Sequence, residues 1–314
     1  MDSKKVALVV GASRGIGRQI AIDLAKNGYA VVIAAKSTSD ASKTRPFPPD
    51  PNSPSSTIST VAREILEASG DASALAVPAD TRDPASIKAL VAATISRHGR
   101  LDAVVYNSGA VWWAAVEDTP LARFQLLQRV NVEGLYAVVQ EALPHLKLSP
   151  AGGRVVVVSP PIYSRFFRGK AAYAVGKVGM SVLTKGLAMD LARQGLDDEM
   201  AVTSLWPAAA IESGATRALT QRDPDGARDL RKATIFSDAV LAVLRAPARS
   251  VNGRLELDED FLRSDAGMTD FSKYAVVPGS TPRRIMPREL PSLAVAEQDD
   301  EGKRMNSAEG KAKL

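Results

Sequence analysis

Short apolar runs alternate with longer helix-like stretches from Val6 to Trp206, and this order restricts the chain to few folds. The apolar runs lack polar alternation, as strands covered on both faces do; they are Val6–Val10, Ala30–Ala34, Ala74–Pro78, Ala103–Tyr106, Arg154–Ser159 and Ala201–Trp206. The stretches between them predict helices at Ile16–Asn27, Thr57–Ala68, Ala85–His98, Leu121–Leu146 and Ala171–Gln194. Strand-helix alternation of this kind predicts an α/β domain with a doubly wound parallel sheet.

Two stretches depart from this alternation. Residues 37–56 are rich in Ser, Pro and Asp, which predicts an irregular, mobile loop after the second strand. Residues 294–314 are charged and aperiodic, so we expect a disordered tail. The prediction is a single domain over residues 1–293, followed by that tail.

Composition argues against several classes of protein. There are no cysteines and only two histidines, His98 and His145, without ligand spacing, so we expect no disulfide, metal site or Ser-His-Asp triad. A net charge of +5 from scattered residues gives no sign of a nucleic-acid surface. We expect no membrane span, because no apolar run is long enough.

A glycine-rich loop, Gly11-Ala12-Ser13-Arg14-Gly15-Ile16-Gly17, follows the first predicted strand and opens the first predicted helix. Glycines let the backbone approach a pyrophosphate, whose charge the helix N-terminus favours. In this position the loop predicts a Rossmann-type dinucleotide site, with Gly11, Ser13, Arg14, Gly15, Ile16 and Gly17 at the cofactor. The alternative is a glycine-rich turn without a ligand.

The end of the second strand bears on which cofactor binds. An acid there would hydrogen-bond the ribose hydroxyl of NAD and repel a 2′-phosphate, but this chain has Ala34-Ala35-Lys36. Lys36 and Arg14 are both cations, so the sequence favours NADP over NAD. In the alternative interpretation, Lys36 is merely solvated beside the loop.

A tyrosine and a lysine stand four residues apart at Tyr173 and Lys177, which places them on one helix face. Tyrosine has a pKa near 10 and is a poor base at neutral pH. A nearby cation lowers the pKa of the phenol, so the pair suits acid/base work on an alcohol or carbonyl. Alone, this spacing also fits a helix with a half-buried Tyr and a surface Lys.

Together these motifs resemble the short-chain dehydrogenase/reductase family over about residues 4–260. Further matching segments are Asp80, Tyr106-Asn107-Ser108-Gly109-Ala110 and Val130-Asn131-Val132-Glu133-Gly134. The resemblance implies that Asp80 contacts the adenine side of the cofactor and that Asn107 and Gly109 line its cleft. It implies that Asn131 holds a water in a proton relay, and that Lys177 binds the nicotinamide ribose and tunes Tyr173.

The chain is most similar to the hydroxysteroid-dehydrogenase-like branch of that family. Six segments carry this likeness: Ile33-Ala34-Ala35-Lys36, Ser159-Pro160-Pro161, Ala172-Tyr173, Gly179-Met180-Ser181, Leu205-Trp206-Pro207 and Phe271–Gly279. Members of the branch often add a sterol-carrier-like domain, which we do not expect after residue 293.

One position departs from the family pattern. The family usually has a serine 13 residues before the tyrosine, and here that residue is Pro160. Ser159 is our candidate for the missing hydroxyl, with Ser164 as another; Ser159 in ordinary packing is the alternative. Pro207-Ala208 likewise lacks the usual glycine.

The sequence therefore predicts an NADP(H)-dependent oxidoreductase that interconverts a carbonyl and an alcohol, with catalytic residues Tyr173, Lys177, Asn131 and Ser159. Trp112, Trp113, Phe166 and Phe167 could line a pocket for a lipid or fatty-acyl-derived substrate, and residues 212–234 could cover it. A cofactor-binding sensor or scaffold without turnover is the alternative. A third interpretation, a protein-interaction module, is supported only by the proline-rich loop at residues 46–54.

Two expectations concern assembly and location. The long helices Leu121–Leu146 and Ala171–Gln194 resemble those through which the family forms homo-oligomers. The final residues, Ala312-Lys313-Leu314, resemble a peroxisomal address read by an import receptor, with the cytoplasm as the alternative.

Overall fold

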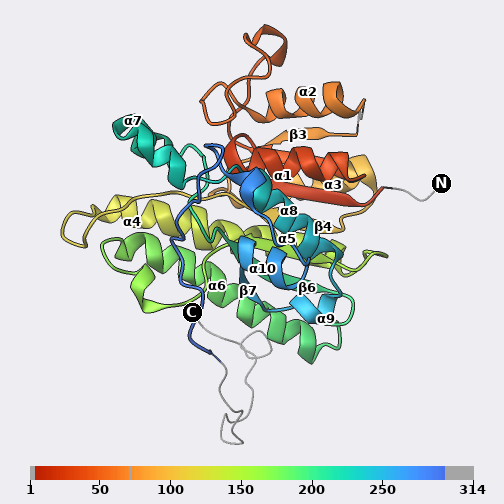
Figure 1. Cartoon of the computed structure of the whole chain (residues 1–314). Coiled ribbons are helices and arrows are strands. Elements are labelled where there is room, and N and C mark those ends of the chain that lie inside the picture. The colour runs from red at the N-terminus through yellow and green to blue at the C-terminus, as the bar shows by residue number, and fades with distance from the viewer. Residues whose placement is uncertain (1–3, 71–72, 294–314) are drawn as a thin grey trace, which may run out of the picture.

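Seven parallel strands form one twisted sheet in the order β3-β2-β1-β4-β5-β6-β7 (Figure 1). The computed structural model describes residues 4–70 and 73–293. The strands are β1 (Val6–Val10), β2 (Ala30–Ala35), β3 (Leu75–Pro78), β4 (Ala103–Tyr106), β5 (Arg154–Val158), β6 (Ala201–Trp206) and β7 (Leu255–Leu257). The predicted doubly wound sheet is confirmed, and β7 is a strand that the sequence did not predict.

Helices cover both faces of this sheet. They are α1 (Gly15–Lys26), α2 (Ile58–Ser69), α3 (Pro84–His98), α4 (Leu121–Gln128), α5 (Gly134–Leu146), α6 (Ala171–Arg193), α7 (Arg217–Arg222), α8 (Thr234–Arg245), α9 (Ala248–Val251) and α10 (Asp258–Ser264). Alternate residues of β1 enter different cores: Val9 packs with α1, α2 and α8, whereas Leu8 packs with α3, α5 and α6. The inner strands β1, β2, β4, β5 and β6 are therefore buried on both faces, which explains their unbroken apolar sequences.

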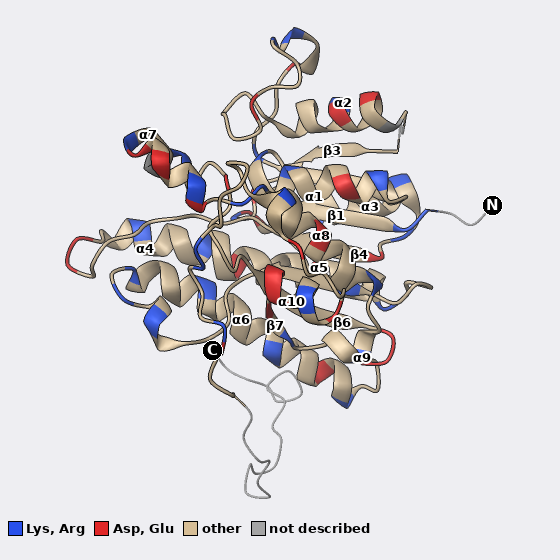
Figure 2. Ribbon diagram, viewed as in Figure 1, with Lys and Arg blue, Asp and Glu red and all other residues tan. Residues whose placement is uncertain are grey.

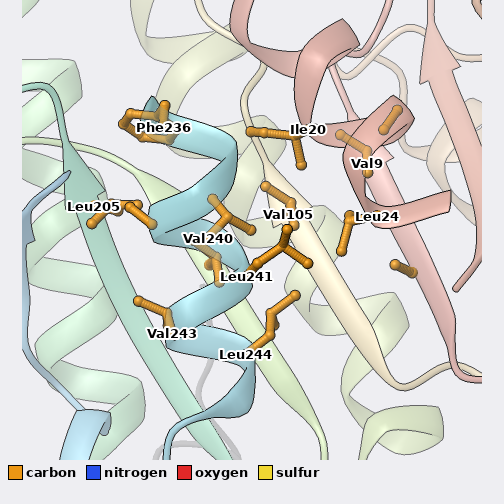
Figure 3. Packing of buried hydrophobic residues seen from close by; sticks show 14 of the residues in the cluster. Val9, Ile20, Leu24, Val105, Leu205, Phe236, Val240, Leu241, Val243 and Leu244 are labelled. Carbon is orange, nitrogen blue, oxygen red and sulfur yellow. The ribbon is translucent and has the colours of Figure 1, made fainter. Parts of the chain in front are cut away.

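Helix α1 is fixed to the sheet by its apolar face. Ile20 and Leu24 of α1 are fully buried and lie among Val9, Val105 and Val240 of the neighbouring elements (Figure 3). Burial of such side chains stabilises the fold by about 1.5–3 kcal/mol each. This packing holds the amino end of α1 at the carboxyl edge of the sheet, where the glycine-rich loop lies.

The helix predicted at Leu121–Leu146 is interrupted by a π-helical segment, Arg129–Glu133. The Val130 carbonyl accepts a hydrogen bond from the Tyr106 hydroxyl at 2.5 Å. The Gly134 N–H, which would bond to the Val130 carbonyl in an α-helix, donates to the Arg129 carbonyl. A Cβ at Gly134 would lie 2.6 Å from the Tyr106 hydroxyl, so glycine allows this approach. The sequence did not predict the interruption, because it depends on a hydrogen bond from Tyr106, which lies on the distant strand β4.

The chain after β6 is tied to the sheet by buried polar contacts. Arg231 and Glu259 form a buried ion pair at 2.7 Å, and the Asp258 carboxylate accepts a hydrogen bond from the Ala208 N–H at 2.8 Å. These contacts hold the segment that follows β6 close to the carboxyl edge of the sheet.

Segments coloured for Lys and Arg lie interspersed with those for Asp and Glu over the ribbon (Figure 2). None of the helices within residues 4–70 and 73–293 is long and apolar enough to cross a membrane. The expected tail at 294–314, with its final tripeptide, lies outside the described residues.

Candidate functional site

A cleft of about 760 Å³ opens at the carboxyl edge of the sheet, around the point between β1 and β4 where the strand order reverses. Open α/β sheets bind ligands at such a point. The side chains and backbone that line this strand-end cleft come mainly from the turns after β1, β2, β3 and β4. Nine of the predicted cofactor residues line it: Gly11, Ser13, Arg14, Gly15, Ile16, Lys36, Asp80, Asn107 and Gly109.

The glycines of the turn after β1 serve different purposes. A Cβ at Gly11, where φ is +85°, would lie 2.6 Å from the Ser108 backbone nitrogen. A Cβ at Gly17 would overlap the Gly11 carbonyl oxygen and lie 2.5 Å from Asn107 Nδ2. That Asn107 Nδ2 donates to the Gly11 carbonyl at 2.9 Å. Gly11 and Gly17 therefore allow α1, β1 and the turn after β4 to pack closely, and Gly17 does not itself line the cleft.

The amino end of α1 suits an anion. Its N-cap residue, Arg14, makes no side-chain capping hydrogen bond, and the first turn has no acidic residue. The first N–H groups of a helix have no partner within the helix and attract negative charge. Since Gly15 and Ile16 line the strand-end cleft, this end of α1 fits the pyrophosphate of a dinucleotide.

The irregular loop at 37–56 folds back onto the glycine turn. The Gly15 N–H donates to the Pro51 carbonyl at 2.9 Å, and the Ser56 hydroxyl donates to the Ser13 carbonyl at 2.7 Å. Asp50 also pairs with Arg217 of α7 at 3.3 Å. The loop thus bridges the glycine turn and α7; its mobility stays a prediction.

Charged side chains gather at the β2 end of the cleft. Asp80 accepts hydrogen bonds from Arg82 Nε at 2.9 Å and Nη2 at 2.6 Å, and Lys36 Nζ lies 3.4 Å from its carboxylate. The Arg82 guanidinium is the main cause that holds the pKa of Asp80 well below its usual range. Arg14 Nη2 donates to the Ser37 hydroxyl at 3.3 Å. Two cations, Lys36 and Arg82, therefore face the Asp80 carboxylate, and Arg14 lines the same cleft. Arg82 was not predicted.

Tyr173 and Lys177 are both buried on α6, one turn apart. The Lys177 ammonium donates to the Val158 carbonyl at the end of β5 at 2.8 Å. Asn131, which is fully buried, accepts a hydrogen bond from the Ala110 N–H at 3.0 Å. A Cβ at Gly109 would lie 3.4 Å from both Asn131 Oδ1 and Lys177 Nζ. Asn131, Lys177 and the Gly109 backbone therefore converge.

Burial dominates the titration of the tyrosine-lysine pair. It raises the pKa of Tyr173 above its ordinary value of 10.0, and it lowers the pKa of Lys177 from 10.5 to about 7. The sequence predicted that the cation would lower the tyrosine pKa. In this structure the direction is opposite, because both groups are desolvated and the ammonium points to Val158.

Ser159 follows directly after β5, and its hydroxyl is engaged by two other serine hydroxyls. The Ser181 hydroxyl donates to Ser159 Oγ at 3.0 Å, and Ser159 Oγ donates to Ser204 Oγ at 3.0 Å. The side chain is fully buried and lines neither the strand-end cleft nor the cavity that contains Tyr173 in its wall. This geometry favours the alternative in which Ser159 is a packing residue. Ser164 is exposed and also lines neither cavity.

A second cavity of about 370 Å³ adjoins the strand-end cleft, and we call it the aromatic pocket. Its lining is largely aromatic and aliphatic: Ile16, Val111, Trp113, Tyr163, Arg165, Phe166, Lys170, Tyr173, Trp206, Pro207, Ala210, Ile211, Ser213, Ala215, Thr216, Ile285 and Met286. Ile16, Val111, Ser213 and Ala215 line both cavities. The aromatic pocket therefore opens beside the strand-end cleft, and Tyr173 lies in its wall.

Two of the four aromatic residues predicted to line the pocket do so. Trp113 and Phe166 line the aromatic pocket, and their rings lie 6.3 Å and 6.1 Å from the Tyr173 ring. Trp112 and Phe167 do not line it. Within the predicted covering segment, residues 213, 215 and 216 reach the pocket.

Several lining residues of the aromatic pocket were not predicted, among them Lys170, Ile285 and Met286. Lys170 stands three residues before Tyr173, so helical spacing could have found it. Ile285 and Met286 lie more than a hundred residues away, and no sequence signal indicates that they return to the site.

Comparisons with known proteins place the chain among oxidoreductases. A family model described as enoyl-(acyl carrier protein) reductase matches residues 11–197. Hydroxysteroid dehydrogenase-like protein 2 of Mus musculus is 34% identical over 273 residues, which cover 86% of this chain and 51% of that protein. The chain thus spans about half the length of that relative.

Two crystal structures resemble the whole fold. A candidate dehydrogenase from Xanthomonas campestris is 34% identical, with a TM-score of 0.75, and covers 94% of this chain and 99% of its own. A short-chain dehydrogenase from Mycobacterium thermoresistibile is also 34% identical, with a TM-score of 0.74, and covers 88% of this chain and 92% of its own.

Proposed function

Because the chain belongs to the short-chain dehydrogenase/reductase family, we propose that it interconverts a carbonyl and an alcohol with NADP(H) as cofactor. One observation carries this proposal: Tyr173 lies in the wall of the aromatic pocket, and one turn along α6 Lys177 converges with Asn131 on Gly109, which lines the strand-end cleft. A cleft for the cofactor and a pocket for the substrate thus adjoin each other beside an acid/base pair.

The strand-end cleft fits a dinucleotide phosphate. The amino end of α1 has no side-chain cap, although its Gly15 N–H donates to the Pro51 carbonyl, and it suits the pyrophosphate. Lys36, Arg14 and Arg82 supply cations for a 2′-phosphate at the β2 end. Asp80 neutralises part of this charge and is held by Arg82 beside the adenine end of the cleft. When bound, the nicotinamide would supply or accept the hydride.

The proton is assigned to Tyr173. The phenol, whose pKa burial raises above its ordinary value of 10.0, is protonated at neutral pH and can donate its proton to the oxygen of a carbonyl under reduction. Lys177, whose pKa is about 7, can carry or release a proton near neutral pH. Asn131 is fixed by Ala110 and positions the polar groups around Lys177.

A cofactor-binding sensor without turnover is the second candidate, and Ser159 favours it. The hydroxyl that the family usually offers to the substrate carbonyl is absent at Pro160, and Ser159 Oγ is engaged with Ser181 and Ser204. We propose that Ser159 shapes the end of β5 and does not touch the substrate. An enzyme of this kind would rely on Tyr173 to polarise the carbonyl.

The experiment that separates the two candidates is a panel assay. Purified protein is mixed with NADPH and a series of aliphatic, aromatic and acidic ketones and aldehydes, and NADPH consumption is followed by absorbance. Hydride transfer to any of them, retained in Ser159→Ala, supports the enzyme with Ser159 as a packing residue. The reverse direction is followed with NADP and the corresponding alcohols. Tight cofactor binding without transfer in either direction refutes the enzyme and leaves the sensor.

A further inference from the structure

The aromatic pocket holds an ammonium group that the proposed chemistry does not use. Lys170 is the N-cap residue of α6 and stands three residues before Tyr173. It lines the aromatic pocket, as does the exposed Arg165. No Asp or Glu is found among the described residues of that lining. The pocket is therefore apolar in its walls and positive in its charge.

The Lys170 ammonium rests on aromatic rings. Its Nζ lies 4.4 Å from the centre of the Phe166 ring and 5.8 Å from the centre of the Trp113 ring. Both of these rings also contact the ring of Tyr173, at 6.1 Å and 6.3 Å between centroids. The cation and the proposed proton donor thus share two aromatic neighbours within one small pocket.

The aromatic rings replace only part of the hydration that the Lys170 ammonium has in water. No hydrogen bond or ion pair joins it to another residue of the described chain. Partial burial lowers the pKa of Lys170 from its ordinary 10.5, which shows that the charged form has lost hydration. A partly desolvated cation gains more from an arriving anion than a fully hydrated one does, because the low dielectric strengthens their attraction.

The other residues that line the pocket indicate the chemistry of the rest of the ligand. Ile211, Ile285 and Met286 complete an apolar chamber of about 370 Å³ together with the aromatic rings. Pockets of this size enclose most of a small organic molecule, and a few polar groups fix its orientation. An apolar body fits the walls, and one negative group fits the ammonium.

We propose that Lys170 binds a carboxylate of the substrate, so that the protein acts on oxo or hydroxy acids with an apolar body in preference to neutral ketones or alcohols. This inference rests on the proposed oxidoreductase function, because it names the substrate of that same site. Lys170 is a specificity residue in this account, and Tyr173 remains the proton donor.

The test compares each acid with its neutral amide. The substrates are benzoylformate, phenylpyruvate and benzoylpropionate, each with its amide, and NADPH consumption gives kcat/KM. We expect at least one acid to exceed its amide by about ten- to a hundredfold, the range of one charge-assisted hydrogen bond. Lys170→Met should abolish this ratio, and Lys170→Arg should retain most of it. Arg168→Met is the matched control, since Arg168 is exposed on the same loop and does not line the pocket.

A binding experiment separates this inference from the proposed function. Phenylbutyrate and phenylbutyramide cannot be reduced, so calorimetry with the NADPH-loaded protein measures recognition without turnover. Tighter binding of the acid that disappears in Lys170→Met supports the inference, even if no substrate is ever turned over. Equal binding of acid and amide, absence of binding by both, or an unchanged preference in Lys170→Met would overturn it.

Discussion

Replacing Gly17 with alanine tests whether the glycine turn is built for close packing. The added Cβ would overlap the Gly11 carbonyl oxygen and lie 2.5 Å from Asn107 Nδ2. Neither neighbour can yield easily. The Gly11 N–H donates to the Ala34 carbonyl at 2.7 Å, and Asn107 Nδ2 donates to the Gly11 carbonyl at 2.9 Å. The variant must therefore move α1 away from β1 or break the Asn107 hydrogen bond.

The loss of stability in Gly17→Ala follows from these two rearrangements. Overpacking a well-packed region costs about 1–3 kcal/mol, and the loss of one hydrogen bond adds about 1 kcal/mol. Displacement of α1 would also disturb the contacts of Ile20 and Leu24 with the sheet (Figure 3). We expect Gly17→Ala to lower the free energy of unfolding by about 2–4 kcal/mol. NADPH binding should weaken too, because the amino end of α1 moves.

Urea unfolding followed by circular dichroism measures the first effect, and NADPH fluorescence titration the second. Gly186→Ala is the control, because Gly186 is exposed within α6 and a Cβ there meets nothing within 4 Å in the single chain. Since Gly186 also lines the groove between α5 and α6, the oligomeric state of this variant is checked by light scattering. Gly186→Ala should raise helix stability by up to about 1 kcal/mol. If Gly17→Ala unfolds at the same urea concentration as the unmodified protein, the close approach of α1 and β1 is not as described.

Three further predictions concern the cofactor, pH and assembly. NADPH should bind more tightly than NADH, and Lys36→Asp should remove this preference in fluorescence titrations; equal affinities in the unmodified protein would refute it. Burial raises the pKa of Asp258 from 3.8 to about 7, so the folded state holds a proton that the unfolded state loses in this range, and stability should fall as the pH rises from 3.8 to about 7. Asp258→Asn should therefore gain relative stability over that range in urea unfolding, while a constant difference would contradict the assignment. Exposed Tyr136 and Val182 line a groove between α5 and α6, so we expect a homo-oligomer in light scattering that Val182→Glu weakens; a monomer in the unmodified protein would rule it out.

The sheet could be predicted because its signal is local. Strands buried on both faces must be apolar throughout, and five predicted helices followed them at the expected spacing. The short β7 strand, Leu255–Leu257, has two residues that are only partly buried, so it lacks such a signal. The π-helical segment around Asn131 depends on a hydrogen bond from Tyr106, and a contact between distant residues leaves no local pattern.

The candidate site could also be predicted only where its signal is local in the sequence. Residues in turns after strands, such as Lys36 and Asp80, could be placed together because parallel strands end at one edge. The direction of the Ser159 hydroxyl could not be predicted, since it depends on Ser181 and Ser204 beneath the strand end. The raised pKa of Tyr173 was missed for a related reason: burial depends on rings brought together by the fold.

Single-turnover reduction by Tyr173→Phe tests the central claim, that Tyr173 supplies the proton. The Phe ring keeps the contacts with Trp113 and Phe166 and removes only the hydroxyl. With NADPH prebound and a carbonyl substrate of the unmodified protein added in a stopped-flow instrument, we expect hydride transfer to slow by about 10²–10⁴-fold. The dissociation constant of NADPH should stay nearly the same. Hydride transfer at the rate of the unmodified protein would show that another group supplies the proton and would contradict the proposed mechanism.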